Sequence, residues 1–87
     1  MPNKGMIMFE ANNESCVDVL DRLILRGYES ELRYGLSIRG KALDILRNKV
    51  ITITKGNYSI EEILRKISNE SSVPYRIENH RIEFSIR

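Results

Sequence analysis

The segment from Val50 to Ile86 changes its hydrophobic period twice, and this order of periods constrains the fold more than any other feature. Val50–Thr54 is β-branched throughout, which is typical of a strand, and Gly56-Asn57 follows as a break. Apolar residues then recur with helical spacing as far as Ile67, and two runs with period two complete the segment. The order predicts a strand, a helix and a terminal β-hairpin.

The helix of this segment is predicted to begin after Ser59. Ser59 and Glu62 fit the capping box, in which the serine side chain accepts from the backbone of the third helical residue and the acid reaches back. Arg65 and Lys66 are expected in its last turn, where cations complement the helix dipole. One apolar stripe follows the spacing i, i+3, i+4, i+7 and consists of Ile60, Ile63, Leu64 and Ile67.

The two alternating runs at the end of the chain predict paired strands. In the first, Tyr75 and Ile77 alternate with charged residues, and in the second Ile82 and Phe84 do the same. The short joint Asn79-His80 between them is typical of a hairpin turn.

The N-terminal part of the chain resembles this segment. Residues 6–23 align with residues 50–67 without a gap at a constant offset of 44. In this alignment Ser15 corresponds to Ser59, which predicts a second helix cap at Ser15. One interpretation is two copies of a β-α-β unit that share a core; the other is that two units of strand and capped helix simply look alike. Asn12-Asn13 is expected to end the first strand, and Gly27 the first helix.

The remaining middle of the chain predicts one more strand and a loop. Residues 32–38 alternate as a half-buried strand does, and residues 40–49 are predicted to be a loop with one helical turn. The expected fold class is α+β: two β-α-β units with two helices packed against small β-sheets, ending in a β-hairpin. Residues 1–5 are expected to be a flexible lead and residues 6–87 a single domain.

Composition limits the classes of protein. Of the 87 residues, 41% are hydrophobic and 30% charged, as in a soluble globular domain. The net charge of +2 does not by itself imply nucleic acid as a partner. No apolar run approaches the roughly 20 residues needed to span a bilayer, so this segment is not expected to insert into a membrane. Nor does the start of the chain resemble a secretory signal, so we expect a cytosolic protein or a mature domain of a longer precursor.

Residues that carry chemistry are few and isolated. The candidates are His80, the neighbouring Glu61 and Glu62, the pair Asp18 and Asp21, and Cys16. His80 lies in the predicted turn without a second ligand nearby in the pattern, and Cys16 lies on an apolar helix stripe, where a buried thiol is expected. We therefore expect no enzyme, no small-molecule substrate, no cofactor and no metal site.

The middle of the chain contains two weaker signals. Residues 35–42 come close to a phosphate-binding loop, but Ala42 stands where a hydroxyl residue is needed, so nucleotide binding is not expected. The same region is basic, which favours a solvated loop, a surface for an acidic protein patch, or, as an alternative function, a small nucleic-acid-binding module. Its cations are Arg33, Arg39, Lys41, Arg47 and Lys49.

In this order of elements, the chain from about Met6 to Ile86 resembles the secretin and TonB short N-terminal domain family. The matching positions are mostly core and capping residues: Phe9, Val19, Leu20, Leu23, residues 32–34, residues 50–53, residues 59–64, residues 75–77 and residues 82–84. The resemblance implies a periplasmic signalling domain of an outer-membrane TonB-dependent receptor, which binds a FecR-like anti-sigma regulator and so controls transcription of transport genes. The C-terminal domain of such an anti-sigma factor and the N-terminal domain of a secretin are similar alternatives.

The resemblance also implies that the partner is a protein. We expect the binding surface on the outward side of the terminal hairpin, at Arg76, Arg81, Glu83, Ser85 and Arg87. If the last strand is a sheet edge, its free backbone groups are available to a partner strand; the same charges would also serve to keep the edge from aggregating.

Overall fold

The structure is a computed structural model, and it describes residues 5–86. Residues 1–4 of the predicted lead and Arg87 of the predicted binding surface lie outside the described residues. The elements follow in the order β1 (Met6–Ser15), α1 (Cys16–Glu29), β2 (Gly35–Ile38), α2 (Lys41–Asn48), β3 (Val50–Ser59), α3 (Ile60–Ser71), β4 (Tyr75–Glu78) and β5 (Arg81–Phe84).

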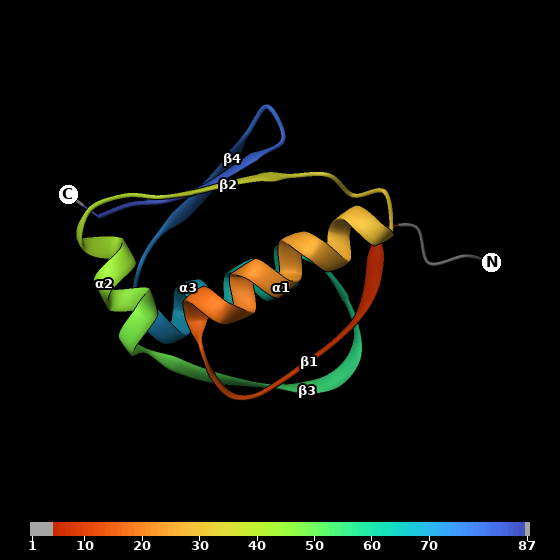
Figure 1. The fold of residues 1–87 in the computed structure, drawn as a ribbon, viewed down its shortest axis with the longest axis horizontal. Helices are drawn as coiled ribbons and strands as arrows, with labels where there is room; N and C mark the ends of the chain where they lie inside the picture. Colours follow the sequence, from red (N-terminus) through yellow and green to blue (C-terminus); the bar gives the residue numbers. More distant parts are fainter. Residues whose placement is uncertain (1–4, 87) are drawn as a thin grey trace.

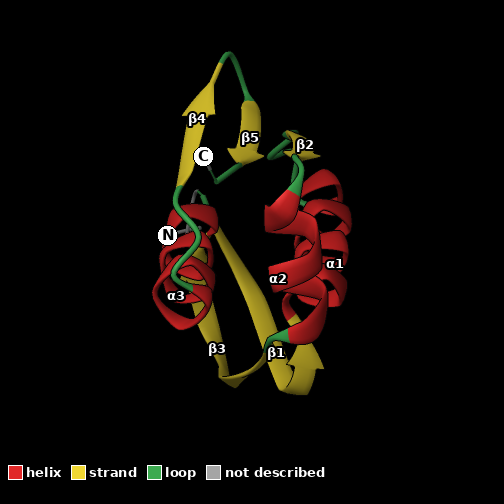
Figure 2. Ribbon diagram, turned by 90° about the vertical axis from the view of Figure 1, so that its left-hand side faces the viewer, coloured by secondary structure: helices red, strands yellow, loops and turns green. Residues whose placement is uncertain are grey.

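The described residues form two small sheets with helices between them (Figures 1 and 2). One sheet pairs β1 with β3 antiparallel, and the other has the strand order β2-β5-β4. Within the second sheet β5 runs parallel to β2 and antiparallel to β4. The predicted α+β class and the terminal hairpin are confirmed.

The two long strands and the helices that follow them repeat at the predicted offset. β1 and β3 each have ten residues and begin at Met6 and Val50, and α1 and α3 begin at Cys16 and Ile60. Both differences are 44. The two copies of the strand pair with each other, and the helices pack against the strands that precede them (Figure 1).

Both helices of the repeat begin at the predicted caps. The Ser59 hydroxyl accepts from the Glu62 backbone at 3.1 Å, and the Glu62 carboxylate accepts from the Ser59 backbone at 2.8 Å, which completes the capping box. The Ser15 hydroxyl accepts from the Asp18 backbone at 3.2 Å. Each serine thus supplies an acceptor for a backbone N–H group that has no partner within its helix.

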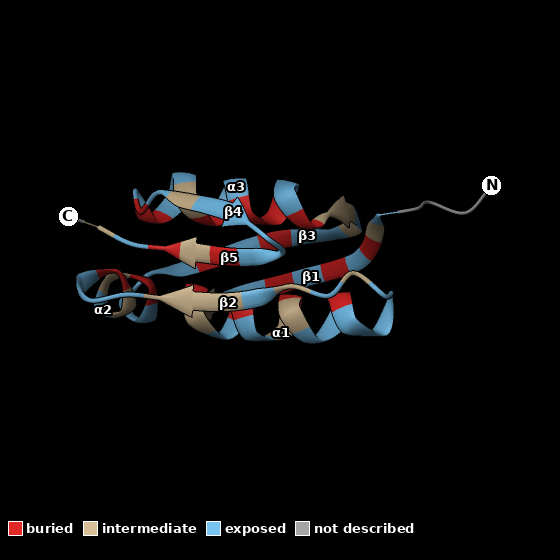
Figure 3. Ribbon diagram, turned by 90° about the horizontal axis from the view of Figure 1, so that it is seen from above, coloured by how far each residue is buried: buried red, intermediate tan, exposed pale blue. Residues whose placement is uncertain are grey.

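The core lies between the sheets and contains both helix stripes. All four residues of the first stripe and all four of the second are buried: Cys16, Val19, Leu20, Leu23, Ile60, Ile63, Leu64 and Ile67. Buried segments alternate with exposed ones along both α1 and α3 (Figure 3). The inner side of the three-stranded sheet contributes Ile82 and Phe84, both fully buried. The predicted periodicities therefore identify the faces that meet in the core.

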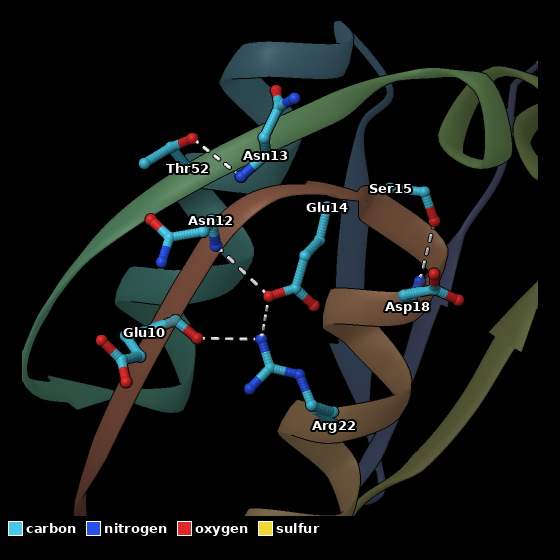
Figure 4. Close-up of polar contacts among 8 residues, drawn as sticks. All are labelled: Glu10, Asn12, Asn13, Glu14, Ser15, Asp18, Arg22 and Thr52. Atoms are coloured by element: carbon cyan, nitrogen blue, oxygen red, sulfur yellow. Dashed lines mark hydrogen bonds and ion pairs between the residues drawn. The ribbon is translucent and has the colours of Figure 1, made fainter.

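The strands of the first sheet are longer than predicted, because their expected breaks are irregularities within the pairing. Asn12-Asn13 does not end β1: the register with β3 shifts between Phe9 and Ala11 and again before Glu14. Asn13 has a φ of 51°, and its N–H donates to the Thr52 hydroxyl at 3.0 Å (Figure 4). Gly56-Asn57 likewise lies inside β3, opposite the start of β1.

Three boundaries differ from those predicted along the helices and β2. α1 continues past Gly27 to Glu29, and the left-handed residue after it is Glu31, with a φ of 62°. β2 begins only at Gly35, after the first half of the alternating segment. α3 continues to Ser71, so its two cations lie in the middle of the helix instead of its last turn.

Residues 40–49, predicted to be a loop with one helical turn, contain an additional helix, α2. α2 spans eight residues and buries Ala42 and Leu46 against the core. No side-chain hydrogen bond caps its start, and Gly40 precedes it with a φ of 56°, a conformation that favours glycine. The usual sequence signal for a helix start is therefore missing here.

Candidate functional site

The hairpin that carries the predicted binding surface has a tight two-residue turn. Asn79 and His80 both have positive φ angles, 53° and 61°, as the central residues of a type I′ turn do. This turn matches the twist of the strands on either side of it. In the ribbon views the tip of the hairpin extends beyond the helix layer (Figures 1 and 2).

The last strand, β5, does not lie at an edge of its sheet, so it has no free backbone groups to pair with a partner strand. β5 lies between β2 and β4, and its backbone pairs with both (Figure 3). The parallel pairing of Ser37 with Glu83 joins residues 46 positions apart, a contact that local periodicity cannot reveal. Within the described residues the edges of this sheet are β2 and β4.

Glu83 is the centre of the outer face of the three-stranded sheet. One of its carboxylate oxygens lies 3.0 Å from the Arg76 Nε on β4, and the other lies 3.0 Å from the Arg39 Nε just after β2. The Glu83 side chain is 18% exposed, whereas those of the two arginines are about 70% exposed. Exposed pairs of this kind add little stability, but these two bring a side chain of β4 and one from just after β2 together around one carboxylate on β5.

The predicted site residues divide according to these contacts. Arg76 and Glu83 meet directly, and Ser85 shares a shallow hollow of about 390 Å³ with them. Arg81 is exposed near the turn and lies beside a second hollow, also lined by Glu83. Sequence reasoning did not place Arg39 in the site, because only the parallel pairing of β2 with β5 brings it to Glu83.

His80 and Cys16, two of the isolated candidate residues, lie in different environments. His80 is exposed, and its ring centroid lies 5.8 Å from that of Tyr34. Cys16 is fully buried, as predicted; burial and then the negative charge of Glu70 raise the pKa of its thiol above the ordinary value of 9.0, while Lys49 opposes this shift. A buried thiol with a raised pKa is a poor nucleophile.

The predicted acids do not form a pair with shared chemistry. Glu62 is bonded to the Ser59 backbone, while Glu61 is exposed beside it on the helix. Asp18 and Asp21 are both exposed on α1. Within residues 5–86, no three or more His, Cys, Asp and Glu side chains are grouped so that they could hold a metal ion.

The basic middle segment is divided among different surroundings. Arg39 pairs with Glu83, and the Arg33 guanidinium lies 5.7 Å from the centroid of the Tyr28 ring. The other three cations lie on α2 or directly after it and are exposed. Arg33 and Arg39 flank β2 at its two ends, so the five cations do not follow one another along a single strand or helix face.

Two further findings concern the chain as a whole. None of the helices in residues 5–86 has both the length and the apolar character that crossing a membrane requires. No protein-family model, no curated protein and no solved structure matches the chain.

Proposed function

We propose that this chain is a periplasmic docking and signalling domain of an outer-membrane TonB-dependent receptor. It binds a FecR-like anti-sigma regulator and thereby couples the loaded receptor to transcription of transport genes. The resemblance of the core and capping positions to the secretin and TonB short N-terminal domain family supports this proposal. The C-terminal domain of the anti-sigma factor, or a secretin's N-terminal domain, would use the same surface.

The observation that carries the proposal is the charged outer face of the three-stranded sheet. Three of its side chains, Arg39, Arg76 and Glu83, are joined by ion pairs across the sheet, so a partner meets a surface that is partly formed in advance. Arg39, Arg76 and Arg81 outnumber Glu78 and Glu83 there, which favours a partner with an acidic patch.

The test is capture of the regulator with the domain as bait. The tagged domain is incubated with a periplasmic extract of a bacterium that has TonB-dependent receptors, and bound proteins are identified by mass spectrometry. Arg81→Glu changes the charge of the proposed surface at an exposed residue. Arg47→Glu on α2 is the matched control, since it makes the same change at another exposed arginine.

We expect the wild type and Arg47→Glu to capture a membrane-anchored anti-sigma regulator, and Arg81→Glu to lose it. Loss with both variants would show a dependence on net charge alone and would contradict the location of the surface. Recovery of nucleic acid that weakens steeply with salt and with Arg47→Glu would instead support the nucleic-acid alternative.

A further inference from the structure

The backbone of β5 shows which groups of the hairpin are already paired. The Gly35 N–H donates to the His80 carbonyl at 2.8 Å, and the Arg39 N–H donates to the Phe84 carbonyl at 3.0 Å. Alternate residues of a strand direct their backbone groups to opposite sides. The even-numbered residues from 80 to 84 therefore face β2, and the odd-numbered residues between them face β4.

The same alternation determines which groups of β4 are unpaired. Arg76 and Glu78 lie opposite the odd-numbered residues of β5, so their backbone groups bond to β5. The N–H and C=O groups of Tyr75 and Ile77 then point away from the sheet. Within residues 5–86 no strand pairs with β4 on the side away from β5, so this edge can accept another strand.

The edges at β1 and β2 are less open. In the first sheet, the Arg22 guanidinium donates to the Glu10 carbonyl at 2.8 Å, and the Arg26 guanidinium donates to the Met8 carbonyl at 3.0 Å (Figure 4 shows the first contact). These arginines therefore occupy two carbonyl groups of β1, those of Met8 and Glu10. In the second sheet the side chains at the edge of β2 are half-buried, whereas 37% of Ile77 is exposed on β4.

The side chains of β4 are complementary to those of a second β4. When two copies pair antiparallel about a two-fold axis at Ile77, Arg76 of each copy lies opposite Glu78 of the other. The two Ile77 side chains then adjoin on the inner side of the sheet. Positions 76 and 78 form the closely spaced pairs, with Cα atoms about 4.5 Å apart, which favours contact between their side chains.

The charges also select this register over its neighbour. A two-fold axis at Arg76 would pair Tyr75 with Ile77 and would satisfy the outward groups of both residues, whereas the axis at Ile77 pairs Ile77 with Ile77 and places Tyr75 opposite Asn79 of the turn. It would, however, place Arg76 directly opposite Arg76 of the second copy, and like charges in this position are destabilising. Register in a short edge pairing is otherwise weakly determined.

We propose that the occupant of the β4 edge is a second copy of this chain, which pairs antiparallel and extends the sheet from three strands to six. A four-residue strand buries little area, so the dimer is weak and forms at high protein concentration. The proposal does not depend on the function proposed above, because the outer face of the sheet stays exposed in the dimer.

The experiment measures self-association by sedimentation between about 10 µM and about 1 mM, together with amide exchange in β4. The test variants are Arg76→Glu and Glu78→Arg. In a dimer of either variant, residues 76 and 78 of opposite copies carry like charges at both places where they meet. We therefore expect association to weaken at least about fourfold. An equimolar mixture restores both opposite-charge pairs, and we expect association to return in the mixture.

A second variant keeps the test independent of the charge changes. Ile77→Pro removes an outward N–H that has no partner in the single chain, so it is tolerated at an edge but prevents pairing there. Unfolding curves establish that each variant is folded. A wild type that stays monomeric at 1 mM, a mixture that fails to associate, or an Ile77→Pro variant that dimerises normally would overturn the proposal. Protection of the Ile77 amide only when a different protein is added would also overturn it.

Discussion

Replacing Gly27 by alanine tests the close approach of α1 to the chain that follows it. A Cβ atom at this position would lie 2.6 Å from the Leu32 carbonyl oxygen, and both atoms belong to backbone or are fixed to it. The contact cannot open freely, because the Leu32 N–H donates to the Gly27 carbonyl at 2.7 Å. Glycine is therefore required here by space and not by its φ angle.

The sign of the effect separates this explanation from helix propensity. Replacing an exposed glycine in a helix by alanine raises the free energy of unfolding by about 0.8–1.0 kcal/mol, because alanine has the higher helix propensity. Forcing an extra methyl group into close-packed structure costs about 1–3 kcal/mol. Since the clash is with backbone, we take the upper part of that range and expect a net loss of about 1–2 kcal/mol in the free energy of unfolding.

The assay is urea unfolding at equilibrium. With a slope of about 2 kcal/mol/M, the midpoint should fall by roughly 0.5–1 M. Gly35→Ala is the control, since the nearest atom to its added Cβ is 4.0 Å away; it should leave the stability unchanged or raise it by up to about 1 kcal/mol. A Gly27→Ala protein at least as stable as the wild type would refute the reasoning.

Three further predictions concern the core, a cap and the buried thiol. Leu64→Ala should lower the free energy of unfolding by about 2–5 kcal/mol, and Leu25→Ala by less than about 0.5, because Leu64 is fully buried and Leu25 is 62% exposed; equal losses would contradict the assignment of the core face. Ser59→Ala should cost about 1 kcal/mol in the same urea assay through loss of the capping box, and an unchanged midpoint would contradict this. The pKa of the Cys16 thiol is raised in the folded state, so above pH 9.0 the thiol loses its proton more readily in the unfolded chain. Its contribution to the free energy of unfolding is therefore complete below pH 9.0 and is lost as the pH rises above it. Cys16→Ala should therefore show a smaller fall in stability above pH 9.0, and parallel profiles for the two proteins would disprove the assignment.

The sequence predicts best those features that depend on neighbouring residues. The cap at Ser59, the two apolar helix stripes and the turn at Asn79-His80 each follow from a short pattern, and the structure contains all of them. The repeat offset of 44 also sets the starts of both long strands and both helices. Asn12-Asn13 was misleading because asparagine tolerates the positive φ of a bulge as readily as that of a turn.

The features that the sequence could not predict depend on contacts between distant segments. α2 buries Ala42 and Leu46 against the core, and this packing replaces the missing capping side chain. The position of Arg39 beside Glu83 requires the parallel pairing of β2 with β5. Parallel neighbours leave no local turn signal, so β5 was predicted as a hairpin strand but not as the central strand of its sheet.

The internal repeat indicates that protection of a strand edge in this fold depends on individual side chains as well as on strand order. Arg22 and Lys66 occupy equivalent positions of the two helices, and each places its cation over an aromatic ring, Phe9 and Tyr58 respectively. Arg22 also reaches the Glu10 carbonyl on the edge of β1, which its forked guanidinium allows and a lysine's single ammonium group does not do while it lies over the ring. Equivalent scaffolds thus carry different edge protection. An edge that remains open in such a chain is a property that substitution can change, and the pairing proposed for β4 is therefore open to test without altering the core.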